Sequence, residues 1–183
     1  CFFVAIMTLL LGRESNPKMC ERRVINNFFS ALFHDLPEAV TRDIISPVKQ
    51  ATDDLPNIVK KIENEIVNKE LVPLMEDFFV NEIIDFTSDE FSNRIKDSDG
   101  NVVNVSWEDL NEKYNEEKYF PIDGRLVRIA DHLSALMEAD ISIKHGITSI
   151  HLQNGRDGLL NSYDQNEIIN GIDVYSLFNE IVS

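Results

Sequence analysis

The sequence predicts an all-α protein, a single domain of packed helices, from three observations. Apolar residues recur every three or four positions over most of the chain, which is the spacing of a helix face. Hydrophobic residues make up 43% and charged residues 27% of the 183 positions, a composition that fits one globular domain with a sizeable core. Prolines and turn sequences lie between the apolar runs, where helices are expected to end.

The chain begins with an apolar run at residues 2–11, which we interpret as a core helix. This run is too short to span a bilayer, which needs about 20 residues, and no basic segment precedes it as in a signal peptide. A lipid-modified Cys1 is the alternative interpretation. Because the first residue is Cys rather than Met, we expect the natural chain to extend upstream.

A second helix is predicted to end near Asp35. Four residues at helical spacing share one of its faces: Val24, Phe28, Ala31 and Asp35. This places Asp35 on the apolar stripe and His34 on the adjoining flank. Proline disfavours helix at the residue before it and is common at the start of a helix, so Pro37 is expected to open the next helix, with Glu38 in its first turn.

The middle of the chain combines another helix with a polar segment. Apolar residues at helical spacing predict a helix over residues 55–67, and Pro73 predicts a break after it. Residues 88–124 are polar and acidic, and they contain an Asp-Gly turn sequence. We interpret them as an insertion or long connection, with a short β-hairpin between residues 93 and 107.

The strongest helical pattern covers residues 124–146. Its predicted apolar face consists of Leu126, Ile129, Ala130, Leu133, Leu136, Met137 and Ile141. Asp131 borders this face. One more short helix is expected near the carboxyl terminus, entered around residues 171–173.

The charge of the chain limits its partners. Its formal net charge is −15, which disfavours nucleic-acid polymers and anionic membrane surfaces, although a bound cation could still hold a small anionic ligand. Two cysteines without a regular framework favour reduced thiols and a cytoplasmic location.

Three residues suggest a metal site. Adjacent His34 and Asp35 offer an imidazole nitrogen and a carboxylate oxygen to one ion, and Asp131 can supply a third ligand. Mixed nitrogen and oxygen ligands suit Mn, Co, Fe or Zn. The residues alone leave other interpretations open, because a buried histidine is usually satisfied by a backbone group and an aspartate at a helix end often meets an arginine.

Two longer motifs resemble a known family. The sequence HDLPEAVTRDIISPVK, residues 34–49, resembles the signature of HD-domain phosphohydrolases, in particular the branch that contains bacterial 5'-deoxynucleotidases and oxetanocin-resistance-like proteins. The sequence RLVRIADHLSALMEA, residues 125–139, is similar to the family helix that carries the last metal-ligating aspartate. The resemblance extends from Phe2 to about His145 and implies an HD-domain helical bundle.

The resemblance also implies roles for individual residues. His34, Asp35 and Asp131 would bind a divalent metal (Mn, Co, Zn, Fe or Mg), and Glu38 would act as the acid/base group beside it. Residues that would border the nucleoside of the substrate are Asp43, Ile44, Ile45 and Ser46. The family's first histidine ligand, and an arginine and a tryptophan that contact phosphate and sugar, are expected upstream of Cys1.

This chain departs from the family pattern at two positions. Arg42 stands where the family usually has glycine, and His132 follows the metal aspartate where lysine or alanine is commoner. Arg128, three residues before Asp131, could offer its charge to a phosphate or form an ion pair with an acidic neighbour.

The function expected from the resemblance is a phosphomonoesterase that acts on nucleoside 5'-monophosphates, including 2'-deoxy ones, as a homodimer. A phosphodiesterase or a guanosine-tetraphosphate-type hydrolase on the same fold is a second hypothesis. A degenerate HD module that binds a nucleotide or a protein without catalysis is a third.

Overall fold

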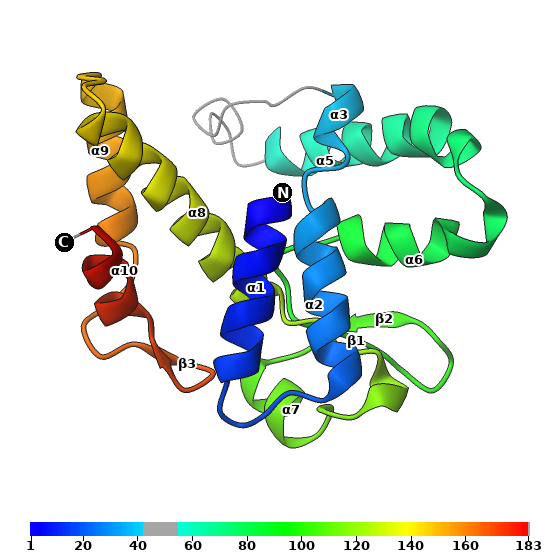
Figure 1. The fold of residues 1–183 in the computed structure, drawn as a ribbon. Coiled ribbons are helices and arrows are strands. Elements are labelled where there is room, and N and C mark those ends of the chain that lie inside the picture. Colours follow the sequence, from blue (N-terminus) through cyan, green and yellow to red (C-terminus); the bar gives the residue numbers. More distant parts are fainter. Residues whose placement is uncertain (42–54, 183) are drawn as a thin grey trace. The chain divides into compact units, whose positions relative to one another are not determined.

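The computed structural model describes residues 1–41 and 55–182, and most of them are helical (Figure 1). Within this described part, strands occur only as two short antiparallel hairpins, which confirms the all-α prediction. The chain divides into two compact units. The first combines Cys1–Leu32 with Asp89–Ser183, and the second is Phe33–Ser88. The expectation of a single domain stays a prediction.

The first unit is built around one long helix. Its helices are α1 (Phe2–Glu14), most of α2 (Glu21–Phe33), α7 (Trp107–Glu112), α8 (Gly124–Lys144), α9 (Ile150–Leu160) and α10 (Val174–Val182), with a 3-10 turn at Glu117–Tyr119. Helices α1, α9 and α10 all pack against α8. The core residues of α8 are Leu126, Val127, Ile129, Ala130, Leu133 and Leu136. Its apolar side chains therefore organise the unit.

The predicted apolar face of α8 is confirmed for its first five residues, whereas Met137 is only half-buried and Ile141 leaves the face. Ile141 is 51% exposed. It follows Leu136 by five residues, which at 3.6 residues per turn rotates it by about 140° around the helix axis. Ile141 therefore leaves the buried face before the helix ends at Lys144.

A buried polar network fixes the start of α8. Asp123 caps the helix, because its Oδ1 accepts a hydrogen bond from the Leu126 backbone nitrogen at 3.0 Å. Its Oδ2 accepts from Nη2 of Arg23 at 2.7 Å and from Nδ2 of Asn170 at 2.8 Å. The Asp123 backbone nitrogen donates to Oδ1 of Asn27 at 2.7 Å. These bonds tie α2, α8 and the segment before α10 together.

The buried face of α2 is mostly polar, which corrects the predicted apolar stripe. Its buried residues are Arg23, Asn26, Asn27, Ser30 and Ala31. Val24 and Phe28 are only half-buried, and the helix ends at Phe33, so Asp35 lies beyond it. The physical reason is that distant groups satisfy the polar side chains; Nδ2 of Asn26, for example, donates to the Pro121 carbonyl at 3.1 Å.

The predicted hairpin is confirmed. Strand β1 (Arg94–Lys96) pairs with β2 (Val102–Asn104) through a turn in which Gly100 has a φ of +82°. A second hairpin, β3 (Ile168–Ile169) with β4 (Ile172–Asp173), leads into α10, whose start at Val174 agrees with the sequence prediction. The sequence predicted neither this hairpin nor α9.

The second unit contains shorter helices. These are α3 (Glu38–Thr41), α5 (Leu55–Ile66), a π-helical segment (Val67–Leu71), a 3-10 turn (Val72–Leu74) and α6 (Asp77–Thr87). The break predicted at Pro73 is confirmed, since the residue lies in the 3-10 turn before α6. Phe86 of α6 is buried and stacks on Phe33, with 6.5 Å between ring centroids. None of the helices in the two described ranges is both long and apolar enough to cross a bilayer.

Candidate metal centre

The candidate metal ligands His34 and Asp35 lie in the turn that follows α2. The Leu36 backbone nitrogen donates to the Phe33 carbonyl at 2.8 Å, and the Glu38 nitrogen donates to the Asp35 carbonyl at 3.0 Å. These short-range bonds turn the chain at once into α3, as Pro37 predicts. Adjacent residues in such a tight turn can aim their side chains at the same point, which a regular helix would not allow.

The structure brings the two side chains together. Nε2 of His34 lies 3.1 Å from Oδ1 of Asp35. The imidazole is almost fully buried, whereas the Asp35 side chain is 43% exposed. His34, and not Asp35, is therefore the buried member of the pair, opposite to the order that the predicted stripe implied.

This donor pair fits a divalent cation. Nitrogen and oxygen ligands bind such ions at about 2.0 to 2.1 Å, so two ligands at neighbouring octahedral positions are about 2.8 to 3.0 Å apart. The separation of Nε2 and Oδ1 is close to this range. The mixed nitrogen and oxygen donors also match the ions expected from the sequence.

Glu38 follows on the next element of the same unit. It is the first residue of α3, as predicted, and it is half-buried. A carboxylate in the first turn is also favourable for the helix, because it complements the unpaired backbone N–H groups there. Its position is thus compatible both with a structural role and with acid/base work beside His34 and Asp35.

Asp131 belongs to the other compact unit. It is half-buried on α8, one helical turn after the buried core residue Val127. Its predicted convergence with His34 and Asp35 stays a prediction. The candidate substrate residues Asp43, Ile44, Ile45 and Ser46, together with Arg42, lie outside the described residues.

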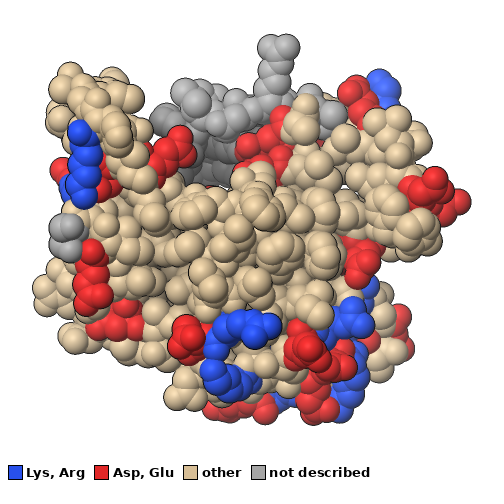
Figure 2. Space-filling view, in the orientation of Figure 1, with Lys and Arg blue, Asp and Glu red and all other residues tan. Residues whose placement is uncertain are grey.

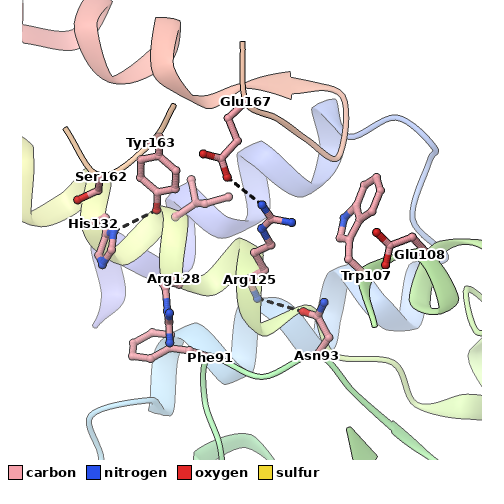
Figure 3. Close-up of a pocket in the computed structure, with 11 residues that line it drawn as sticks. Phe91, Asn93, Trp107, Glu108, Arg125, Arg128, His132, Ser162, Tyr163 and Glu167 are labelled. Atoms are coloured by element: carbon pink, nitrogen blue, oxygen red, sulfur yellow. Dashed lines mark hydrogen bonds and ion pairs between the residues drawn. The ribbon is translucent and has the colours of Figure 1, made fainter. Parts of the chain in front are cut away.

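His132, which departs from the family pattern, lines a cavity in the first unit (Figure 3). Its Nδ1 lies 3.0 Å from the hydroxyl of Tyr163. Burial raises the pKa of Tyr163 to about 12 and lowers the pKa of His132 below its usual range. The phenol is therefore protonated at neutral pH, and its hydroxyl and Nδ1 of the imidazole share one hydrogen bond.

Of the two contacts weighed for Arg128, the structure bears only on the ion pair with an acidic neighbour, and the contact with a phosphate stays a prediction. The Arg128 guanidinium lies over the ring of Phe91, 5.0 Å from the centroid. Among the described residues no carboxylate lies within ion-pair distance of it, so the alternative of a neighbouring acidic partner is not observed. The sequence analysis missed the cavity itself, although Arg125, Arg128 and His132 follow one another at helical spacing.

The described residues thus form a mostly helical protein in which an imidazole and a carboxylate approach each other just after a helix. The model of a family described as "HD domain" matches residues 1–159, so the chain belongs to the HD domain family. HD domains bind divalent metal, and the family consists in general of metal-dependent phosphohydrolases. Searches of curated proteins and of solved structures found no significant match.

Proposed function

We propose that this chain is a cytoplasmic, metal-dependent phosphomonoesterase that releases phosphate from (deoxy)nucleoside 5'-monophosphates. The observation that carries the proposal is the 3.1 Å approach of His34 to Asp35, with Glu38 opening the next helix of the same unit. The substrate class rests on the resemblance of residues 34–49 and 125–139 to the 5'-deoxynucleotidase branch. The two cysteines fit a reducing compartment.

The roles of the residues follow from their donor atoms. When bound, a divalent cation supplies Lewis-acid activation of water and neutralises charge on the phosphoryl group. His34 donates a nitrogen lone pair, and Asp35 and Asp131 donate carboxylate oxygens. The Glu38 carboxyl orients the attacking water or protonates the leaving ribose oxygen, a role that typically contributes about 10²- to 10⁴-fold to the rate. Asp43, Ile44, Ile45 and Ser46 border the nucleoside.

The proposal is tested on the full-length protein purified without added metal. Elemental analysis is combined with a phosphate-release assay on deoxynucleotides, ribonucleotides, cyclic nucleotides and pyrophosphorylated nucleotides. We expect divalent metal to copurify with the protein and phosphate to be released from the 5'-monophosphates. Release from cyclic or pyrophosphorylated nucleotides alone would replace this proposal with the diesterase or guanosine-tetraphosphate alternative.

Two variants separate metal binding from proton transfer. Asp131→Ala is expected to lose both metal and activity, because it removes a ligand, whereas its control Glu138→Gln alters an exposed acid of the same helix. Glu38→Gln is expected to keep the metal and to lose about 10²- to 10⁴-fold in kcat. Its control, Glu65→Gln, alters an exposed acid of α5. A fully active Glu38→Gln enzyme would disprove the assigned role.

We also propose a homodimer, again from the resemblance. Several large apolar side chains of α1 and α2 are exposed: Phe2, Phe3, Leu10, Ile25 and Phe29. Figure 2 shows few charged residues over these two helices. Two copies that each carry a net charge of −15 repel each other least where carboxylates are sparse, so this apolar face is the favoured contact surface.

Light scattering tests this assembly. Leu10→Glu places a charge on the exposed apolar face and is expected to yield monomers, whereas Leu74→Glu, at an 82% exposed position of the other unit, should leave the dimer intact. A wild-type protein that is monomeric at the concentrations of the activity assay would overturn the proposal.

A further inference from the structure

A second site is built on the first unit, around the cavity that His132 lines. The cavity has a volume of about 560 Å³, within the range of small-molecule sites. Its lining comes from α8, α7 and the segments before β1 and β3. His34, Asp35 and Asp131 are not among the described residues that line it. The described lining of the cavity comes from residues of the first unit alone.

Among the described residues that line the cavity, Arg128 is the cation that remains available to a ligand. Arg125 already forms an ion pair, because its Nη2 lies 2.8 Å from Oε1 of Glu167. Arg128 is exposed and lies over Phe91, and none of the described carboxylates pairs with it. Stacking on Phe91 restricts the guanidinium without using its N–H donors, so the group is ordered and still able to bind an anion.

The opposite side of the cavity offers a flat ring and a carboxylate. In Figure 3, Arg125 lies between Tyr163 on one side and Trp107 with Glu108 on the other. Trp107 is held in place, since its Nε1 donates to Oδ1 of Asn170 at 2.9 Å. Glu108 is exposed, and among the described residues it has no ion-pair partner.

These features define complementary chemistry. A ligand that fits carries an anionic group for Arg128, a flat ring that packs beside the Trp107 indole, and N–H donors for Glu108. We propose that this cavity of the first unit binds a small heteroaromatic anion with N–H donors on its ring, such as a purine mononucleotide. This inference does not depend on the proposed catalytic activity.

Trp107 provides a direct readout, because it is the only tryptophan of the chain. The full-length protein is titrated with AMP in the presence of a chelator, which prevents metal-dependent turnover, and tryptophan fluorescence is recorded. Adenosine lacks the phosphate, ribose 5-phosphate lacks the ring, and purine riboside 5'-monophosphate lacks the exocyclic amine. We expect a saturable fluorescence change with AMP, and affinities lower by about tenfold or more for adenosine and for ribose 5-phosphate. Purine riboside 5'-monophosphate, whose ring has no N–H donor for Glu108, should bind more weakly than AMP.

Two matched arginine variants locate the anion. Arg128→Gln is expected to weaken AMP binding by about tenfold or more, since it removes the charge that pairs with phosphate. Arg22→Gln is the control, because Arg22 is also exposed and also lies over a phenylalanine ring, that of Phe120, at 5.5 Å. Glu65→Gln, which alters an exposed acid of α5 in the other unit, should bind AMP like the wild type.

The proposal has defined ways to fail. The site is disproved if AMP gives no saturable change at millimolar concentration, or if Arg128→Gln binds AMP as tightly as the wild type does. Ribose 5-phosphate that binds as tightly as AMP would overturn the ligand class, because the ring would contribute nothing. Circular dichroism of Arg128→Gln confirms that the variant is folded, as expected for an exposed side chain.

Discussion

Arg23 and Arg128 lie in the same compact unit, but their guanidinium groups have opposite environments. Arg23 is fully buried and donates to Oδ2 of Asp123 at 2.7 Å and to Oδ1 of Asn111 at 2.8 Å. Arg128 is exposed, lies on an aromatic ring at the edge of a cavity, and has no acidic partner among the described residues. The first cation is held by a carboxylate of its own chain, and the second is accessible to a ligand.

The difference shows where stability and binding are located in this unit. A buried charge that loses its partner carries the full cost of desolvation. Removing either Arg23 or Asp123 is therefore expected to destabilise the fold, because the other charge would stay buried without a counter-ion. Removing an exposed charge changes the free energy of unfolding little. Arg128 can therefore bind a ligand without being needed for the stability of the fold. This contrast is tested by replacing charged residues that range from fully buried to partly exposed and measuring the free energy of unfolding of each variant.

The largest effect is expected for Asp123→Asn. The substitution keeps the shape and the helix-capping ability of the side chain, but it leaves the Arg23 charge buried without a counter-ion. We expect the free energy of unfolding to fall by about 3 to 5 kcal/mol. Urea denaturation followed by circular dichroism measures this change.

Asp173→Asn is the matched control for Asp123→Asn. Asp173 also accepts a bond at a helix start, from the Ser176 nitrogen at 2.9 Å, but no buried arginine depends on it. Because Asn and Asp are similarly good capping residues, its effect should be a few tenths of a kcal/mol. Equal losses for the two variants would show that capping, and not the buried charge, dominates at Asp123.

Asp140 provides an intermediate case. Its carboxylate is 8% exposed and contacts two cations, Nζ of Lys144 at 2.9 Å and Nε of Arg156 at 2.9 Å. The hydrogen bond from Lys144, with a further one from Arg156, lowers the pKa of Asp140 below its usual range. Asp140→Asn is expected to lower the free energy of unfolding by about 1.5 to 3 kcal/mol at neutral pH.

The pH dependence of this loss has a definite sign. A carboxyl whose pKa is lower in the folded state stabilises the fold above its unfolded pKa of about 3.9, and this contribution disappears as the pH falls through the folded value. The difference in stability between wild type and Asp140→Asn should therefore be constant at neutral pH and shrink below about pH 4. Denaturation curves measured over this range test it; a difference that grows on acidification would contradict the ion-pair account.

Of the three ion pairs, that of Arg125 is expected to show the smallest effect when it is removed by Arg125→Gln. The ion pair between Arg125 and Glu167 is partly exposed, with side-chain exposures of 43% and 27%. Such pairs contribute about 0.2 to 1 kcal/mol, and less at high salt. A loss above 2 kcal/mol in the same urea assay would mean that this side of the cavity supports the fold and is not merely a binding surface.

Local patterns in the sequence predicted much of the fold. Pro37 and Pro73 mark helix boundaries because proline restricts the backbone whatever surrounds it, and the structure confirms both. The face of α8 that carries Leu126 and Leu133 was predictable because apolar residues must be buried. Helix α9 was missed, since it contains Gly155 and Gly158 and has no buried residue to set a pattern.

The polar interior was not predictable from local patterns. The apolar spacing of α2 pointed to Val24 and Phe28, but the helix buries Arg23 and Asn26, whose partners are 88 to 100 residues away in sequence. The sequence near Arg23 does not predict that its ion-pair partner is Asp123.

The candidate site shows the same limit. The contact of His34 with Asp35 was predictable because the two residues are neighbours, whereas the cavity requires Phe91, Trp107 and Tyr163 to meet from separate segments.

The separation of 100 residues between Arg23 and Asp123 also affects how the molecule can be made. As the chain leaves the ribosome, α1 and α2 emerge before Asp123 has been synthesised. The Arg23 guanidinium of α2 therefore has no counter-ion at that stage. Contacts between such distant positions slow folding, because a large loop must close before any of them forms. The amino-terminal helices thus cannot complete their packing until the second half of the polypeptide has been made. Their normally buried surface is exposed in this interval, and this is when binding by a chaperone would prevent most aggregation.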